Sequence, residues 1–86
     1  MSLPVDLQHA TGVTRDFSPT GVYFETDLKF QEGSLISFTI DFDSTNPGEK
    51  TQLECTGRVV RVDLGNTGKV GVAVKLEEQH LRTVKR

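Results

Sequence analysis

The sequence contains one cysteine, Cys55, among its 86 residues. A single cysteine excludes an internal disulfide and a cluster of thiolate metal ligands. Cys55 stands in an apolar stretch with strand character, where a thiol usually serves as a small packing residue. A signal peptide is not predicted either, because no basic start followed by an apolar core opens the sequence. These absences favour a location in the cytoplasm.

Long hydrophobic runs are missing as well. No stretch approaches the roughly 20 apolar residues that a membrane-spanning helix needs. A length of 86 residues, 35% hydrophobic residues, eight glycines and three prolines suit a small, β-rich globular fold. We therefore expect one domain covering residues 1–86, and no membrane span.

Residues for catalysis or metal binding are scarce. His9 and His80 are isolated, without an H-x-x-x-H motif or a carboxylate triad beside them, so we expect no metal site. Ser18 lacks the G-x-S-x-G context of a hydrolase nucleophile. The sequence therefore predicts neither an enzymatic role nor a cofactor.

Basic and aromatic residues are also few. Ten basic residues against twelve acidic ones give a net charge of -2, and the isoelectric point is about 5.6. Proteins that hold nucleic acid through its phosphates usually carry a net basic surface. An aromatic content of 7% leaves few platforms for stacking bases. A barrel that binds oligonucleotides is thus disfavoured, whereas a small anionic ligand remains compatible.

What the sequence does contain is alternation between apolar and polar residues, which predicts strands. The alternation is cleanest in residues 34–42, where one face carries four large core side chains: Ile36, Phe38, Ile40 and Phe42. Strands are predicted at residues 3–9, 13–17, 21–26, 34–42, 51–63 and 70–76.

The fifth of these strands changes parity along its length. Leu53 and Cys55 lie on one face, whereas Val60 and Val62 have the opposite parity. A bulge or sharp coil near Gly57 explains this change, and small barrels use such bends to close.

The last ten residues, 77–86, lack clear strand alternation. Two glutamates suit the N-terminus of a helix, and four residues fall near one helical face: Leu76, His80, Leu81 and Val84. We predict a short C-terminal helix covering one end of the barrel. On such a helix Arg82 and Arg86, four residues apart, would form a solvated basic stripe.

The most distinctive stretch lies in residues 15–26. Residues 18–21, Ser-Pro-Thr-Gly, suit a β-turn, in which Gly21 takes the fourth position or accepts positive φ. Asp16 and Ser18 are two residues apart in the extended segment before the turn, so their side chains point the same way. Together they could hold a planar polar ligand. Asp and Ser also satisfy turn backbones routinely, and spacing alone favours that simpler role.

Arg15 precedes this pair. In a regular strand it points inward or across the strand from Asp16. It is therefore a phosphate ligand only if the strand is bulged at this position.

The segment D-F-S-P-T-G resembles the Asp/Asn-x-Ser-x-x-Gly signature of the PilZ domain. Further agreement follows in the same order along the chain: a glycine opening the strand of residues 33–42, then G-R-V-V-R-V at 57–62, then V-G-V-A-V at 70–74. Typical PilZ domains are small β-barrels that bind the bacterial second messenger cyclic di-GMP. The resemblance implies a six-stranded antiparallel barrel.

The resemblance also implies roles for single residues. Asp16 and Ser18 would hydrogen-bond a guanine edge, Gly21 would permit the tight turn, and Arg15 is a candidate ligand residue beside them. Ligand-binding members carry an R-x-x-x-R motif upstream of the turn, on the arm that wraps the ligand. Residues 1–14 contain no arginine here.

Two functions follow from the resemblance. The first is a cyclic di-GMP-binding signalling domain that couples the ligand to a protein partner. The alternative is a degenerate PilZ module that has lost the nucleotide and acts through protein contacts.

Overall fold

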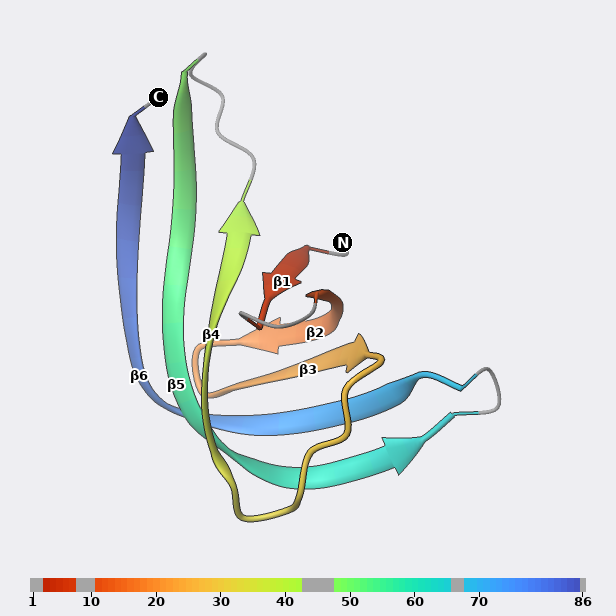
Figure 1. The fold of residues 1–86 in the computed structure, drawn as a ribbon. Coiled ribbons are helices and arrows are strands. Elements are labelled where there is room, and N and C mark those ends of the chain that lie inside the picture. Colours follow the sequence, from red (N-terminus) through yellow and green to blue (C-terminus); the bar gives the residue numbers. More distant parts are fainter. Residues whose placement is uncertain (1–2, 8–10, 43–47, 66–67, 86) are drawn as a thin grey trace.

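The chain folds into a closed antiparallel β-barrel. The computed structural model describes residues 3–7, 11–42, 48–65 and 68–85. It contains six strands: β1 (Pro4–Asp6), β2 (Thr11–Ser18), β3 (Gly21–Thr26), β4 (Leu35–Phe42), β5 (Glu49–Leu64) and β6 (Val70–Lys85). Their order around the barrel is β1-β2-β3-β6-β5-β4, and β1 also pairs with β4 (Figure 1). The predicted mainly-β, six-stranded barrel is confirmed.

The core is built from the inward faces that the alternation predicted. In β4, Phe38 and Ile40 are buried, and Ile36 and Phe42 pack against the core while partly buried. Phe24 of β3 is fully buried, and its ring lies 5.5 Å from that of Phe38, centroid to centroid. Burial of such side chains contributes roughly 1.5–3 kcal/mol each.

Two long strands, β5 and β6, bend together and form the frame of the molecule (Figure 1). Their register shifts between Thr56 and Gly57 and again between Val59 and Arg61. A Cβ on Gly57 would lie 2.5 Å from the carbonyl oxygen of Lys75, so only glycine fits at the first shift.

The predicted bulge near Gly57 is therefore confirmed, with one difference. Val59 is 1% exposed and Val60 is 54% exposed. Val60 is the extra residue of the second bulge and faces solvent, whereas Val62 packs against the core. The inward-facing residues of β5 are thus odd-numbered up to Val59 and even-numbered from Val62, and the switch falls at Val60.

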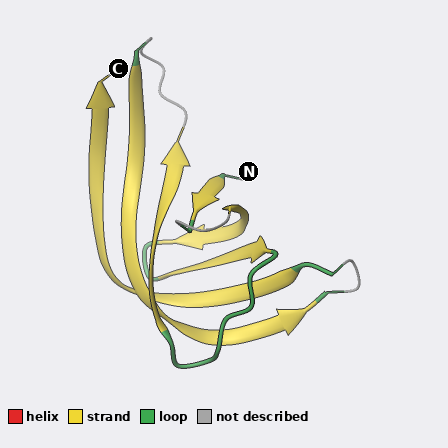
Figure 2. Cartoon of the chain, viewed as in Figure 1, coloured by secondary structure: helices red, strands yellow, loops and turns green. Residues whose placement is uncertain are grey.

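The predicted C-terminal helix is wrong. Figure 2 shows no helix in the described part of the chain, and β6 continues to Lys85. Residues 76–85 pair with residues 49–57 of β5, so β5 satisfies backbone groups that a helix would have satisfied internally. Thr83 and Val84 are β-branched and favour a strand. No helix among the described residues is long and apolar enough to cross a membrane.

The last strand, predicted at 70–76, extends to Lys85 as β6, and the other predicted strands agree with the structure within a few residues at their ends. The first is the exception, because β1 covers only Pro4–Asp6. Residues 8–10, including His9, lie outside the described residues.

Candidate functional site

The hairpin between β2 and β3 is held in place by β6. Residues 18–21 form its tip, with the two end residues as Cα partners. The backbone N–H of Leu76 donates to the carbonyl oxygen of Thr20 at 3.0 Å. The Gln79 side chain donates to the carbonyl oxygen of Pro19 at 2.7 Å. The tip is thus fixed by residues far along the sequence.

Asp16, Ser18 and Gly21 meet at a shallow depression beside this tip. The depression measures about 200 Å³, and Tyr23 and Ala73 also line it. Asp16 and Ser18 are both exposed, and the residue between them is half-buried. The structure therefore confirms that their side chains share one face, the outer face of the barrel.

These two side chains differ in what they contact. The Ser18 hydroxyl lies 3.4 Å from the Thr20 hydroxyl and 3.3 Å from the carbonyl oxygen of Gly21, both long for hydrogen bonds. Among the described residues, the Asp16 carboxylate forms no hydrogen bond and no ion pair. Ser18 thus contacts the turn weakly, whereas Asp16 does not support it.

Gly21 does not use a left-handed backbone. Positive φ is found instead at three other glycines of the described chain: Gly33, Gly48 and Gly68. A Cβ on Gly21 would lie 3.1 Å from the carbonyl oxygen of Val74. A small residue is therefore favoured at position 21 because the Val74 carbonyl oxygen is close and the depression stays open. The backbone φ angle of Gly21 does not require glycine.

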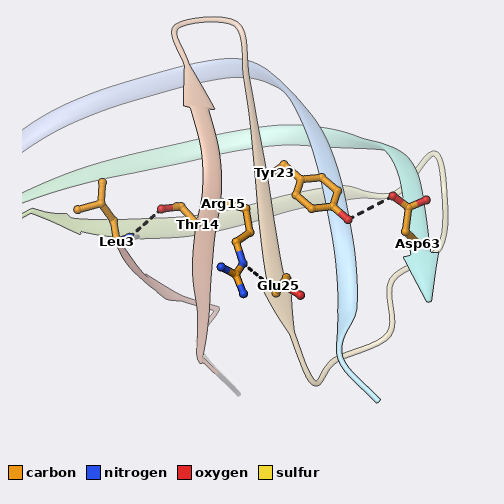
Figure 3. A network of polar contacts seen from close by, with 6 residues as sticks. All are labelled: Leu3, Thr14, Arg15, Tyr23, Glu25 and Asp63. Carbon is orange, nitrogen blue, oxygen red and sulfur yellow. Dashed lines mark hydrogen bonds and ion pairs between the residues drawn. The ribbon is translucent and has the colours of Figure 1, made fainter. Parts of the chain in front are cut away.

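Arg15 is the extra residue of a β-bulge. The register of β2 against β3 shifts between Thr14 and Asp16, so Arg15 and Asp16 both face outward. The bulge meets the condition for a ligand role, but the guanidinium turns to Glu25, with which it forms an ion pair (Figure 3). Arg15 does not line the depression. It lines a larger pocket of about 460 Å³ that also includes Gly12 and Lys69.

Tyr23, which lines the depression, forms a polar cluster with Arg61 and Asp63. The Tyr23 hydroxyl donates to Asp63 Oδ2 at 3.2 Å (Figure 3). Arg61 Nε donates to the same oxygen at 3.1 Å, and Arg61 Cζ lies 5.7 Å from the centroid of the Tyr23 ring. Burial of the ring and the hydrogen bond to Asp63 raise the pKa of Tyr23 above its ordinary value. The cluster holds an aromatic ring and a cation in fixed positions.

The strand register places this cluster in one row with Asp16. The successive Cα partners across β2, β3, β6 and β5 are Asp16, Tyr23, Ala73 and Arg61. Neighbouring strands lie about 4.8 Å apart, so Asp16 and Arg61 are separated by roughly 14 Å at the backbone. Sequence reasoning missed the cluster. The outward parity of Tyr23 was visible, but its partners depend on the register of β5.

Other candidate residues do not gather into a site. His80 is exposed, and no group of three metal-ligating side chains occurs among the described residues. Cys55 is 3% exposed, and burial raises its pKa to about 11. Arg82 lies on a strand and forms an ion pair with Glu54 at 2.6 Å, so the helical arginine stripe is not formed. Arg86 lies outside the described residues.

Comparison with known proteins identifies one protein family that this chain matches. A family model for the PilZ domain matches residues 1–86, the full length of the chain. No curated protein and no solved structure matches. PilZ domains form a family of cyclic di-GMP receptors, which bind a ligand and are not a catalytic family. With this match over its whole length and its closed six-stranded barrel, the chain belongs to the PilZ domain family.

Proposed function

We propose that this domain binds cyclic di-GMP on the outer face of the barrel, at the depression beside the tip of the β2–β3 hairpin. The observation that carries the proposal is the Asp16 carboxylate, which is exposed beside Ser18 and has no partner among the described residues. A carboxylate accepts hydrogen bonds, and a guanine edge offers N–H donors to it. Ser18 adds a hydroxyl that can donate or accept.

The cations available for the phosphates differ from those of typical members. Lys75 is exposed and is the Cα partner of Gly21, and Arg58 is in turn the Cα partner of Lys75. Arg61 lies in the same row as Asp16, with its guanidinium over Tyr23. These residues replace the upstream arginines only in part, because Arg58 and Arg61 already pair with Glu77 and Asp63.

The expected affinity is therefore weak. Residues 1–14 supply no guanidinium, and a hydrogen bond to a charged group contributes about 1.5–3 kcal/mol. Each missing arginine then lowers affinity by roughly one to two decades. Sub-micromolar binding to this 86-residue chain would contradict this expectation and would make Arg61 and Lys75 the residues to substitute next.

The absence of arginine from residues 1–14 also supports the alternative, a degenerate PilZ module that acts through protein contacts. In either case we place the domain in second-messenger signalling in a bacterial cytoplasm, where it acts on a protein partner. The two functions differ in one measurable property: the wild-type chain either binds cyclic di-GMP or does not, even at millimolar ligand.

The test compares Asp16→Ala and Ser18→Ala with Asp27→Ala as a matched control. Asp27 is an exposed carboxylate that lines the larger pocket. Cyclic di-GMP titration and thermal unfolding are measured on each variant. Loss of a partner to a guanine edge costs about 1–3 kcal/mol, so we expect roughly 5- to 150-fold weaker binding for the first two variants. The control is expected to bind normally, and the Asp16 and Ser18 variants should keep the wild-type melting temperature.

Gly21→Val separates the site from the turn. The new side chain occupies the depression, and its Cβ lies close to the carbonyl oxygen of Val74, so we expect blocked binding with a modest loss of stability. If Asp16→Ala and Ser18→Ala lower the melting temperature as much as Gly21→Val, with binding lost only in proportion, the pair stabilises the turn and the proposal is wrong.

A further inference from the structure

The C-terminal half of β6 has an unpaired edge. β3 pairs with β6 only from Val70 to Lys75, and the hairpin tip reaches Leu76 and the Gln79 side chain. Beyond that point β6 pairs with β5 alone among the described residues, and Figure 1 shows it as the outermost strand of the sheet. Its outer edge therefore presents free backbone N–H and C=O groups, which can pair with another strand.

This edge is also exposed on both faces. All seven residues from Glu77 to Thr83 are exposed, although they belong to a paired strand. Leu81 is 69% exposed, and its Cα partner on β5, Leu53, is 8% exposed. Leu53 in turn is the partner of the buried Ile40. Leu81 thus extends an apolar row of the core to the rim of the sheet.

The charges along the edge are ordered. Glu77 and Glu78 come first, and Arg82 follows toward the C-terminal end. An antiparallel copy of the same strand would place the acidic part of one edge beside the basic part of the other. Residues opposite or diagonal across two antiparallel strands interact, and opposite charges there are favourable. The edge is therefore complementary to itself, and no proline interrupts residues 70–86.

We propose that two copies of this chain pair through the β6 edge, antiparallel, about a two-fold axis at Leu81. Residues directly opposed in an antiparallel pair point to the same face, so a two-fold axis perpendicular to the sheet lies midway between the two copies of one residue. With the axis at this position, the two exposed Leu81 side chains meet at the centre of the interface. The strand order β4-β5-β6 of one copy then continues into β6-β5-β4 of the other.

The same register explains the charges. Glu78 of each copy lies diagonal to Arg82 of the other, within reach of such long side chains. Arg82 already contacts Glu54 within its own chain at 2.6 Å. A guanidinium has five N–H donors, so Arg82 can contact both carboxylates at once. The interface thus combines backbone pairing, an apolar centre and two symmetric ion pairs.

The experiment is sedimentation of the full 86-residue chain from micromolar to several hundred micromolar protein. We expect a concentration-dependent dimer for the wild type. Glu78→Arg and Arg82→Glu should each weaken it about tenfold or more, because each turns two attractive contacts into two repulsive ones. Glu32→Arg, a charge reversal at an exposed residue outside the strands, is the matched control and should dimerise normally. Circular dichroism shows that each variant keeps its β fold.

Mixing distinguishes the proposed geometry from a general loss of stability. Glu78→Arg and Arg82→Glu carry opposite charges at facing positions, so an equimolar mixture of the two should form a heterodimer. The Glu78→Arg/Arg82→Glu double variant should dimerise with itself for the same reason. A wild-type chain that stays monomeric over the whole range would overturn the proposal. So would a dimer that survives both single changes, or one that neither the mixture nor the double variant restores.

Discussion

The Tyr23 ring occupies the space above Gly71. A Cβ on Gly71 would lie 1.8 Å from the Tyr23 hydroxyl oxygen and 2.6 Å from Cζ of the ring. Both atoms are at the far end of a side chain that can rotate, so the ring moves and the strand does not. Gly71→Ala is therefore expected to break the hydrogen bond to Asp63 and to separate the ring from Arg61, with the barrel still closed.

The size of this effect follows from the two interactions that the displaced ring no longer makes. A hydrogen bond to a charged acceptor contributes about 1.5–3 kcal/mol, and we take the lower end because the Asp63 side chain is 47% exposed. An exposed cation–π contact adds about 0.5–1 kcal/mol. Alanine recovers roughly 0.5–1 kcal/mol over glycine within a strand. The net loss is about 1–2 kcal/mol, and each kcal/mol lowers the melting temperature of such a domain by roughly 4–8 °C.

A double-mutant cycle tests this reasoning. Denaturant unfolding of Gly71→Ala, Tyr23→Ala and the double variant gives the coupling between the two positions. Gly71→Ala should lower the free energy of unfolding only when the Tyr23 ring is present. An equal loss in the wild-type and Tyr23→Ala backgrounds would refute the steric argument. Tyr23 is the only tyrosine and the chain has no tryptophan, so tyrosinate absorbance follows its ionisation directly. The raised pKa of Tyr23 should fall toward its ordinary value in Gly71→Ala.

Three further changes probe the barrel itself. Gly57→Ala should destabilise by roughly 1–3 kcal/mol or more in urea unfolding, because its Cβ meets the Lys75 carbonyl oxygen at 2.5 Å; wild-type stability would contradict the close approach. Burial favours the neutral thiol of Cys55, so its stabilising effect is present below the ordinary thiol pKa of about 8.5 and is lost as pH rises through about 11. Alkylation of native Cys55 should accordingly be slow at pH 8 and fast only after unfolding. Thr14→Val should cost about 1–3 kcal/mol, because Leu3 N donates to the buried Thr14 hydroxyl at 2.8 Å, whereas Thr14→Ser should cost less.

Local alternation was sufficient to predict most of the barrel. Phe38 and Ile40 repeat at the period of a strand, and no competing pattern overlaps them. The same period placed Asp16 and Ser18 on one face, which needs no knowledge of the partner strand. The resemblance to the PilZ domain supplied the closed topology, which alternation alone does not determine.

The features missed all depend on contacts between distant segments. Residues 77–85 carry a helix-like spacing, but pairing with β5 outweighs it. The sequence left open whether the strand is bulged at Arg15, and the bulge and the pairing of Arg15 with Glu25 follow from the register of β2 against β3. Asp63 reaches Tyr23 across 40 residues of sequence. Register is set by the whole barrel, so local alternation does not predict it; only the bulge near Gly57 was predictable, from the change of inward-facing residues along its own strand.

Titration of the isotope-labelled wild-type chain with cyclic di-GMP, followed by the backbone amide signals in NMR, tests the central claim most directly, because it detects weak binding and locates it. The account predicts saturable shifts that centre on residues 16–23 and Ala73, around the depression beside the hairpin tip. It would be contradicted by shifts that centre on Gly12 and Lys69 in the larger pocket, or by spectra that do not change at millimolar ligand.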